Sequence, residues 1–186
     1  MRTIQTALLC TALLIGAGAL ADAQNAPAAM PMILTSSSFT DGGVIPDKYT
    51  QASPSPVSPA LSWENTPPGT QSFALIMHDP DVAPRKGVDD VLHWIAFNIP
   101  AGVHSLPEGV PTEPTLPDGT IQPNNLGGHP GFMGPGARNV YHHYTIELYA
   151  LDTKLNLGPD ATRQQVLAAM DGHIIGKAVI EGRFHR

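Results

Sequence analysis

Two short segments that are apolar on both faces constrain the fold of this chain more than any other feature. Ser72–His78 (Ser-Phe-Ala-Leu-Ile-Met-His) runs directly into an Asp-Pro-Asp turn, and Leu92–Ile99 (Leu-His-Trp-Ile-Ala-Phe-Asn-Ile) ends at a proline. Apolar residues on both faces are typical of a central strand in a sheet that is covered on both sides. The sequence therefore predicts a layered fold dominated by strands.

Three further segments indicate strands, and a fourth alternates more loosely. Tyr141–Leu151 is the clearest, because polar and apolar residues alternate along it, while Ala60–Trp63 and Lys177–Phe184 are shorter. Met32–Phe39 alternates loosely and ends in a Thr-Asp-Gly-Gly turn. Residues 102–136 are almost entirely Gly-, Pro- and Asn-rich loop, and a loop of this length inside a compact domain is usually functional.

One helix is expected near the C-terminus. Thr162-Arg-Gln-Gln165 fits a capping box, in which the first and last of four residues satisfy each other's backbone N–H groups. Gly172 is placed to end the helix. The residues that we expect on its apolar face are Val166, Leu167, Met170 and Ile174.

Composition excludes several classes of protein. Glycine and proline make up about a fifth of the 186 residues, against a usual share of about 12%. Charged residues are only 14% of the chain, which argues against a helical bundle or a coiled coil. With 10 Lys and Arg, a net charge of −6 and no basic run, a nucleic-acid partner is not expected. The apolar share of 42%, in ordered blocks, argues against intrinsic disorder.

The N-terminus has the pattern of a secretory signal peptide. Arg2 precedes an uncharged apolar run, and the small residues around Ala23 favour cleavage after it. The run is about 14 residues long, shorter than the roughly 20 that a membrane span needs, so an uncleaved anchor is the less favoured alternative. Its Cys10 is the single cysteine, so the mature chain is expected to lack disulfides and thiolate chemistry. We expect a signal peptide over 1–23, a flexible leader over 24–31, a single domain over 32–186, and a periplasmic or secreted location without a stable membrane anchor.

Histidines and aspartates at strand ends are the candidate functional residues. In Tyr141–Leu151 the period of two places His142 and Tyr144 at the start of an apolar face, with His143 on the more polar face. The same test groups His93 with Ile95, Phe97 and Ile99, and Asp79 and Asp81 follow directly on Ser72–His78. Two histidines, a tyrosine and two aspartates are thus expected to converge on one small concave site.

Simpler interpretations of these residues remain open. A histidine that begins an apolar stripe is usually a half-buried structural residue, and Asp-Pro-Asp is commonly a turn. A metal site of His93, His142 and an aspartate lacks any supporting spacing, so neither metal nor other cofactor is expected. Five other histidines have no identifiable partner and are taken as structural or surface residues: His78, His104, His129, His173 and His185.

An ordered set of motifs resembles the phosphatidylethanolamine-binding protein (PEBP) family, in its bacterial Raf-kinase-inhibitor-like (YbhB/YbcL-type) branch. The matching pieces run in the family's order across nearly the whole mature chain. They are Phe39–Thr50, Ser58–Trp63, Pro68–Asp81, His93-Trp94, Gly134–Gly136, His142–Tyr144, Ala169–Gly176 and Gly182–Phe184.

The resemblance implies a mostly β fold: a β-sandwich with a large central sheet, a smaller flanking sheet and a few short helices near the C-terminus. It also implies a small pocket for phosphate-like anions or phospholipid head groups, in which imidazoles, a phenol and glycine-loop N–H groups donate to an oxyanion. Anion binding is expected to strengthen as pH falls, if the aspartates hold the imidazoles in the donating tautomer. The ligand-binding residues it implies are Asp79, Pro80, Asp81, His93, Gly134, Gly136, His142 and Tyr144.

Two departures from the family pattern concern the pocket. After Gly136 the chain continues Ala-Arg-Asn-Val-Tyr instead of with prolines and a further glycine, so Arg138 can add a cation for a phosphate. His78 stands where family members commonly have an acidic residue before Asp-Pro-Asp.

Two classes of function compete at this site. The favoured one is an exported, non-catalytic binding protein, with an unidentified protein partner left open; for an exported chain we regard the kinase-inhibitor name as inherited. The alternative is a hydrolase, lyase or isomerase with His142 or His93 as general base, although no activated nucleophile is visible. Because bacterial relatives are often dimers, the resemblance also implies a homodimer.

Overall fold

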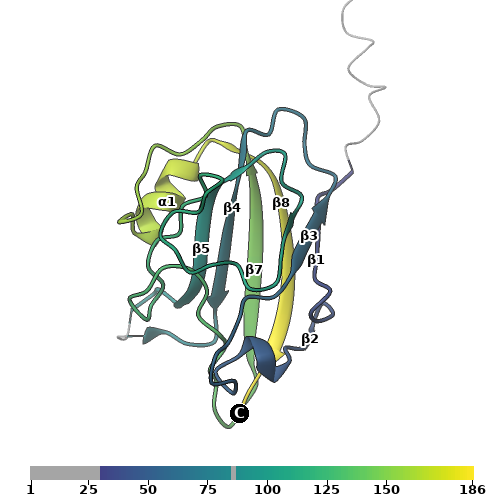
Figure 1. Cartoon of the computed structure of the whole chain (residues 1–186), viewed down its shortest axis with the longest axis vertical. Coiled ribbons are helices and arrows are strands. Elements are labelled where there is room, and N and C mark those ends of the chain that lie inside the picture. The colour runs from purple at the N-terminus through teal and green to yellow at the C-terminus, as the bar shows by residue number, and fades with distance from the viewer. Residues whose placement is uncertain (1–29, 85–86) are drawn as a thin grey trace, which may run out of the picture.

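The structure, a computed structural model, describes residues 30–84 and 87–186. The expected signal peptide and all but the last two residues of the expected leader lie outside the described residues. The described chain forms two β-sheets with one α-helix near the C-terminus (Figure 1). The predicted β-sandwich-like fold is confirmed, although α1 is the single α-helix of these residues; the other helical element is a 3-10 helix, η1 (Asp47–Tyr49).

The large sheet has five strands in the order β2-β8-β7-β4-β5. Neighbouring strands are antiparallel except for β2, which runs parallel to β8. At its centre, β4 is buried along almost its whole length and β5 is nearly so, as expected from their apolar residues. The strand bounds are β2 Gly43–Val44, β4 Ser72–Asp79, β5 Val91–Pro100, β7 His142–Leu151 and β8 Ile174–Phe184.

A smaller sheet of three antiparallel strands covers one face of the large sheet. Its order is β1 (Ile33–Thr35), β3 (Leu61–Glu64) and β6 (Ser105–Leu106). The main core cluster lies between the two sheets and combines Trp63 of β3 with Phe73 of β4, whose rings meet edge to face at 5.3 Å. As expected, Tyr144 and the apolar residues two, four and six positions later on β7 face this core.

The other face of the large sheet is covered by α1 (Arg163–Met170) and its flanking loops. The predicted capping box is present, and Gly172, with φ of +79°, follows the helix. Two residues expected on the apolar face are not there: Leu167 is on the exposed side of the helix, and Ile174 lies beyond the helix, which ends at Met170. Leu167 is 41% exposed, and Ile174 is the first residue of β8.

A β-bulge in β5 changes the direction of one candidate side chain. Met77 pairs with Trp94 and His78 pairs with Leu92, which leaves His93 as an extra residue opposite β4. His93 and Trp94 therefore both lie on the side of the main core, whereas Ile95 and Phe97 pack against the helix side. The expectation that His93 shares a face with Ile95 and Phe97 is wrong, because strict alternation fails at a bulge.

Candidate functional site

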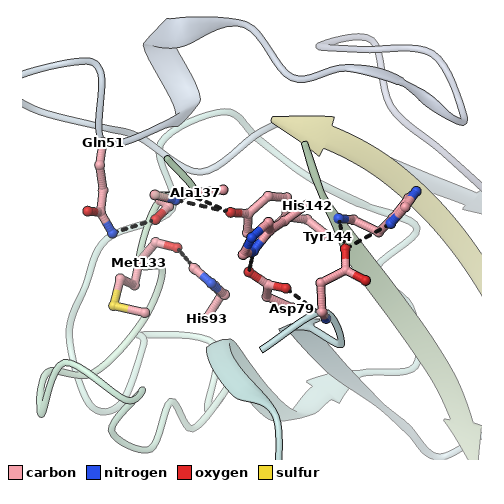
Figure 2. Close-up of polar contacts among 11 residues, drawn as sticks. Gln51, Asp79, His93, Met133, Ala137, His142 and Tyr144 are labelled. Atoms are coloured by element: carbon pink, nitrogen blue, oxygen red, sulfur yellow. Dashed lines mark hydrogen bonds and ion pairs between the residues drawn. The ribbon is translucent and has the colours of Figure 1, made fainter. Parts of the chain in front are cut away.

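A pocket of about 330 Å³ lies where β4 ends and β7 begins. Four polar side chains from three neighbouring strands converge there: Asp79 from β4, His93 from β5, and His142 and Tyr144 from β7 (Figure 2). We call these four residues the pocket floor. They meet because β4 pairs antiparallel with both β5 and β7, so that β4 ends at the same end of the sheet at which the other two strands begin.

Asp79 holds the ring of His142. The Nδ1 atom of His142 lies 2.8 Å from Oδ2 of Asp79, and Oδ1 accepts the backbone N–H of Asp81 at 3.0 Å. Because a carboxylate only accepts, Nδ1 carries the proton, and Nε2 of the neutral ring is an acceptor. The expectation that an aspartate selects a tautomer donating to the ligand is therefore wrong for His142: this ring donates into the pocket only when it is protonated.

The backbone of the facing loop orients His93. Its Nδ1 donates to the carbonyl of Met133 at 2.8 Å, and its own carbonyl accepts the N–H of Met133 at 2.8 Å. Burial lowers the pKa of His93 below its ordinary value, although the Met133 hydrogen bond and the charge of Asp79 oppose this shift. His93 is thus a neutral ring near pH 7, and its Nε2 is a hydrogen-bond acceptor.

Tyr144 joins the floor to the glycine loop. Its hydroxyl oxygen accepts the backbone N–H groups of Ala137 at 3.0 Å and Gly136 at 3.2 Å. Burial, reinforced by the nearby Asp79 carboxylate, raises the pKa of Tyr144 to about 12, so the hydroxyl keeps its proton. We expected the glycine-loop N–H groups to donate to a ligand, but those of Gly136 and Ala137 are used by Tyr144.

Segment 50–56 clamps the loop that forms the pocket wall. Gln51 donates its backbone N–H to Pro135 and its side-chain amide to the carbonyl of Gly134, at 2.8 and 3.0 Å. A Cβ on Gly134 would lie 3.1 Å from the backbone of Thr50, which explains why glycine is needed for this close approach. Arg138 is exposed at the mouth and takes part in none of the ion pairs found within the described residues.

Five of the eight predicted ligand-binding residues line this pocket: Asp79, His93, Gly136, His142 and Tyr144. The other three do not. Pro80 is an exposed turn residue, and Gly134 packs behind the wall. Asp81 turns away to accept the backbone N–H and the Nδ1–H of His143 at 2.7 and 2.8 Å, and that backbone contact is the main cause that lowers the pKa of Asp81.

Sequence reasoning missed several lining residues. Gln51 and Met133 reach the pocket from segments without regular structure, so no periodicity marks them. Arg138, noted only as an added cation, is at the mouth as that reasoning requires. The remaining lining residues are Val82, Val91 and Ala137.

A second histidine–carboxylate cluster lies on the opposite face of the large sheet. The Nδ1 of His78 is 2.5 Å from Asp90, which also binds Arg163, and Nε2 of His78 is 3.8 Å from Glu147. Glu147 in turn accepts from Lys177 at 2.6 Å and from Tyr149 at 2.7 Å. His78 was expected to have no partner, and this is wrong. Because it lies on the face away from the pocket, its departure from the family pattern does not alter the pocket floor.

His173 also has a partner that the sequence did not indicate. Its Nδ1 lies 2.8 Å from Asp152, with both side chains almost half exposed. His173 and Asp152 are 21 residues apart in the chain, and His78 and Asp90 are 12 apart. Folding, rather than local spacing, brings both pairs together.

Residues 30–84 and 87–186 contain neither a metal-binding cluster nor a membrane-spanning helix. No group of three or more histidine or acidic side chains there is arranged to hold a metal ion. None of the helices in that part of the chain is long and apolar enough to cross a membrane.

Comparison with known proteins identifies the family to which this fold belongs. The family model described as phosphatidylethanolamine-binding protein matches residues 35–185. A UPF0098 protein of Methanothermobacter thermautotrophicus is 43% identical over 155 residues, which are 83% of this chain and 99% of the relative. The chain therefore belongs to the phosphatidylethanolamine-binding protein family, as the motifs indicated.

Solved structures agree with this assignment. The crystal structure of the PEBP homologue CT736 from Chlamydia trachomatis has a TM-score of 0.75 at 35% identity. The match covers 84% of this chain and 98% of the CT736 chain. YbcL of E. coli, described as a member of the mammalian PEBP family, has a TM-score of 0.74 at 30% identity. The match covers 84% of this chain and 99% of the YbcL chain. A further relative, 35% identical over 161 residues, is provisionally named lipoprotein LppC in Mycobacterium tuberculosis and is matched over 75% of its length.

Proposed function

We propose that this protein is an exported, non-catalytic binding protein whose pocket takes a phosphate-like anion, either free or as a phospholipid head group. The observation that carries the proposal is the composition of the pocket: the His142–Asp79 pair and the Tyr144 hydroxyl on the floor, with Arg138 at the mouth. A protonated imidazole, a phenol and a guanidinium all donate to oxyanions. The name of the matching family points to the same class of ligand.

The charge distribution supports a local mode of binding. The net charge is −6, so long-range fields do not attract anions, and recognition depends on groups at the pocket itself. A volume of about 330 Å³ is at the lower end of small-molecule sites. A whole lipid would therefore bind by its head group, with the acyl chains outside.

A phosphorus NMR titration tests this function. Phosphate, phosphoethanolamine and a short-chain phosphatidylethanolamine are added in turn to the mature protein, to His142→Ala and to His173→Ala. The last variant is a matched control, because His173 forms a pair with Asp152 of the same 2.8 Å length at the other end of β7 and β8. We expect saturable shifts with wild type and the control but not with His142→Ala. Absence of any saturable change with the wild type would contradict the proposal.

Export is the second element of the proposal. It rests on the signal-peptide pattern of residues 1–23 and on the lipoprotein name of one relative. Expression of the full chain in a Gram-negative host, followed by fractionation and N-terminal sequencing, is expected to give a periplasmic protein that begins at Gln24. An uncleaved cytoplasmic product would refute export while leaving the pocket proposal intact.

The Asp79–His142 pair also supports a second candidate function, catalysis of hydrolysis, elimination or isomerisation. A carboxylate that orients an imidazole is an arrangement that enzymes use for general-base catalysis. The same phosphorus spectra distinguish the two functions, because turnover of a phosphate ester produces a new resonance that grows with time. Binding without any new resonance favours the non-catalytic function.

A further inference from the structure

The two histidines of the pocket floor differ in what they can offer a ligand. Nδ1 of His142 faces a carboxylate, which is a charge partner for the protonated ring, whereas Nδ1 of His93 faces only the neutral carbonyl of Met133. His93 is also more enclosed, with 3% of its surface exposed. His142 can therefore become a cationic donor, whereas the neutral ring of His93, with its proton on Nδ1, has a lone pair on Nε2.

The Nε2 atom of His93 is available to a ligand. It has no hydrogen-bond partner within the described residues. Unlike Nε2 of His78, which is fully buried and unpaired, it is not fully buried. The groups around it are those of the floor, with Arg138 at the mouth; His78 and Asp90 act on it only through the sheet. None of these groups is placed to donate to it in the structure.

An acceptor of this kind discriminates between anions by their protons. A ligand oxygen that carries hydrogen can donate a hydrogen bond to Nε2. A bare or methylated oxygen cannot, and its lone pair repels the lone pair of Nε2. A buried polar group left unpaired is strongly unfavourable, and for this reason sites built around a hydrogen bond reject analogues that lack the matching atom. Phosphomonoesters have an acidic proton with a pKa near 6, whereas phosphodiesters and sulfate have none at that pH.

We propose that His93 makes the pocket selective for oxyanions that carry their own proton, phosphomonoester monoanions above all, over phosphodiesters and sulfate. This inference rests on the proposed anion-binding function and narrows its ligand class. A free phosphate monoester and a lipid that ends in a phosphomonoester share this chemistry, while the phosphodiester of an ethanolamine head group does not.

Two isomeric ligands isolate the proton. Ethyl phosphate and dimethyl phosphate have the same atoms, and at pH 5.5 both are mainly monoanions, so they differ chiefly in whether an oxygen carries hydrogen or methyl. Their affinities are measured by phosphorus NMR titration with wild type, His93→Gln and His142→Gln. A soluble monoester and a dispersed phosphatidate are then compared to separate the free from the lipid source.

We expect wild type to bind ethyl phosphate at least tenfold more tightly than dimethyl phosphate, equivalent to about 1.4 kcal/mol. His93→Gln, whose amide can turn its NH₂ toward the ligand, is expected to reduce this ratio to below threefold. His142→Gln is expected to weaken both ligands and to keep the ratio, because the residue that accepts the proton is still present.

Each other outcome is decisive. A wild-type ratio below tenfold, or a ratio that stays above threefold in His93→Gln, would overturn the selectivity while leaving anion binding intact. Failure of both ligands to bind would refute the proposed function and this inference with it. If His93→Gln does not fold, nitrogen NMR of the wild-type ring at pH 5.5 decides: a neutral ring with its proton on Nδ1 supports the proposal, and a proton on Nε2, in a neutral or a cationic ring, overturns it.

Discussion

The two faces of β4 carry the same chemical pair with opposite surroundings. His78 and Asp79 are neighbours in the chain, so their side chains point to opposite sides of the sheet. On the helix side, His78 pairs with Asp90, and Arg163 and Glu147 extend the pair to a network of charges in which Nε2 of His78 is enclosed by protein. Asp90 and Arg163 also line a second pocket of about 350 Å³. On the other side, Asp79 pairs with His142, and the remaining nitrogen of that ring faces an open pocket.

This difference separates a structural ion network from a binding site. Both pairs are only slightly exposed, with side-chain values of 14% and 21% for His78 and Asp90 and 18% and 5% for His142 and Asp79. Burial and pairing therefore do not identify function by themselves. The distinguishing property is that the second ring nitrogen of His142 faces an accessible cavity, whereas Nε2 of His78 is enclosed by protein.

The largest expected effect comes from breaking the charge network on the helix side. Asp90→Ala removes the carboxylate that pairs with both Arg163 and His78, and it leaves two largely buried cationic or polar groups without their partner. We expect the free energy of unfolding to fall by about 2 kcal/mol, less than for a fully buried pair because water reaches the site. Urea unfolding at pH 7 measures this loss. Phosphate affinity is expected to stay within twofold, and a tenfold loss of affinity would show that the two faces are not separate.

Asp79→Asn applies the converse test to the pocket side. The amide retains the shape of the carboxylate, but it removes the negative charge that accompanies a protonated His142. We expect phosphate affinity at pH 6 to fall about three- to tenfold, an effect of roughly 1 kcal/mol. Isothermal titration gives the affinity, with Asp152→Asn as the control for an exposed His–Asp pair. Equal affinities of Asp79→Asn and wild type would remove the pair from the binding site.

A smaller effect concerns the pH dependence of stability through His93. Burial places its folded pKa below the unfolded value of about 6.5, so as pH falls below 6.5 the unfolded chain takes up a proton that the folded ring refuses. Stability from this group is therefore full above pH 6.5 and is lost as pH falls toward the folded pKa, by less than about 1.4 kcal/mol per pH unit. Unfolding curves from pH 7.5 to 5 are expected to show a shallower decline in His93→Gln than in wild type. Parallel declines would indicate that His93 titrates normally.

The smallest effect is expected at the exposed pair. His173 and Asp152 are 47% and 46% exposed in their side chains, and solvent screens such a contact. His173→Ala is expected to change the free energy of unfolding by less than about 0.5 kcal/mol and to leave phosphate affinity unchanged. A larger loss of stability, measured in the same urea series, would show that distance rather than burial sets the strength of these pairs.

The strands were predictable because their apolar patterns reflect burial directly. The alternation in β7 correctly placed His142 and Tyr144 on the core side and His143 on the other. His93 was assigned to the right site for the wrong reason: the period of two put it with Ile95, and only the bulge turns it to the pocket. A bulge depends on pairing with another strand, so a pattern within one segment does not reveal it.

The parts that the sequence did not reveal are non-local hydrogen bonds. The glycine-loop N–H groups were expected to face a ligand, but the Tyr144 hydroxyl accepts two of them. The tautomers of both pocket histidines depend on Asp79 and Met133, which lie 63 and 40 residues away in the chain. Spacing along the chain does not predict such contacts, although they determine which atoms face the pocket.

The most direct test is to observe all eight histidine rings by nitrogen NMR while inorganic phosphate is added. We expect saturable shifts confined to His93 and His142, with a single dissociation constant, and no change at His78 or His173. Shifts that do not saturate, or that appear at His78 and the exposed rings but not at the two pocket rings, would contradict it.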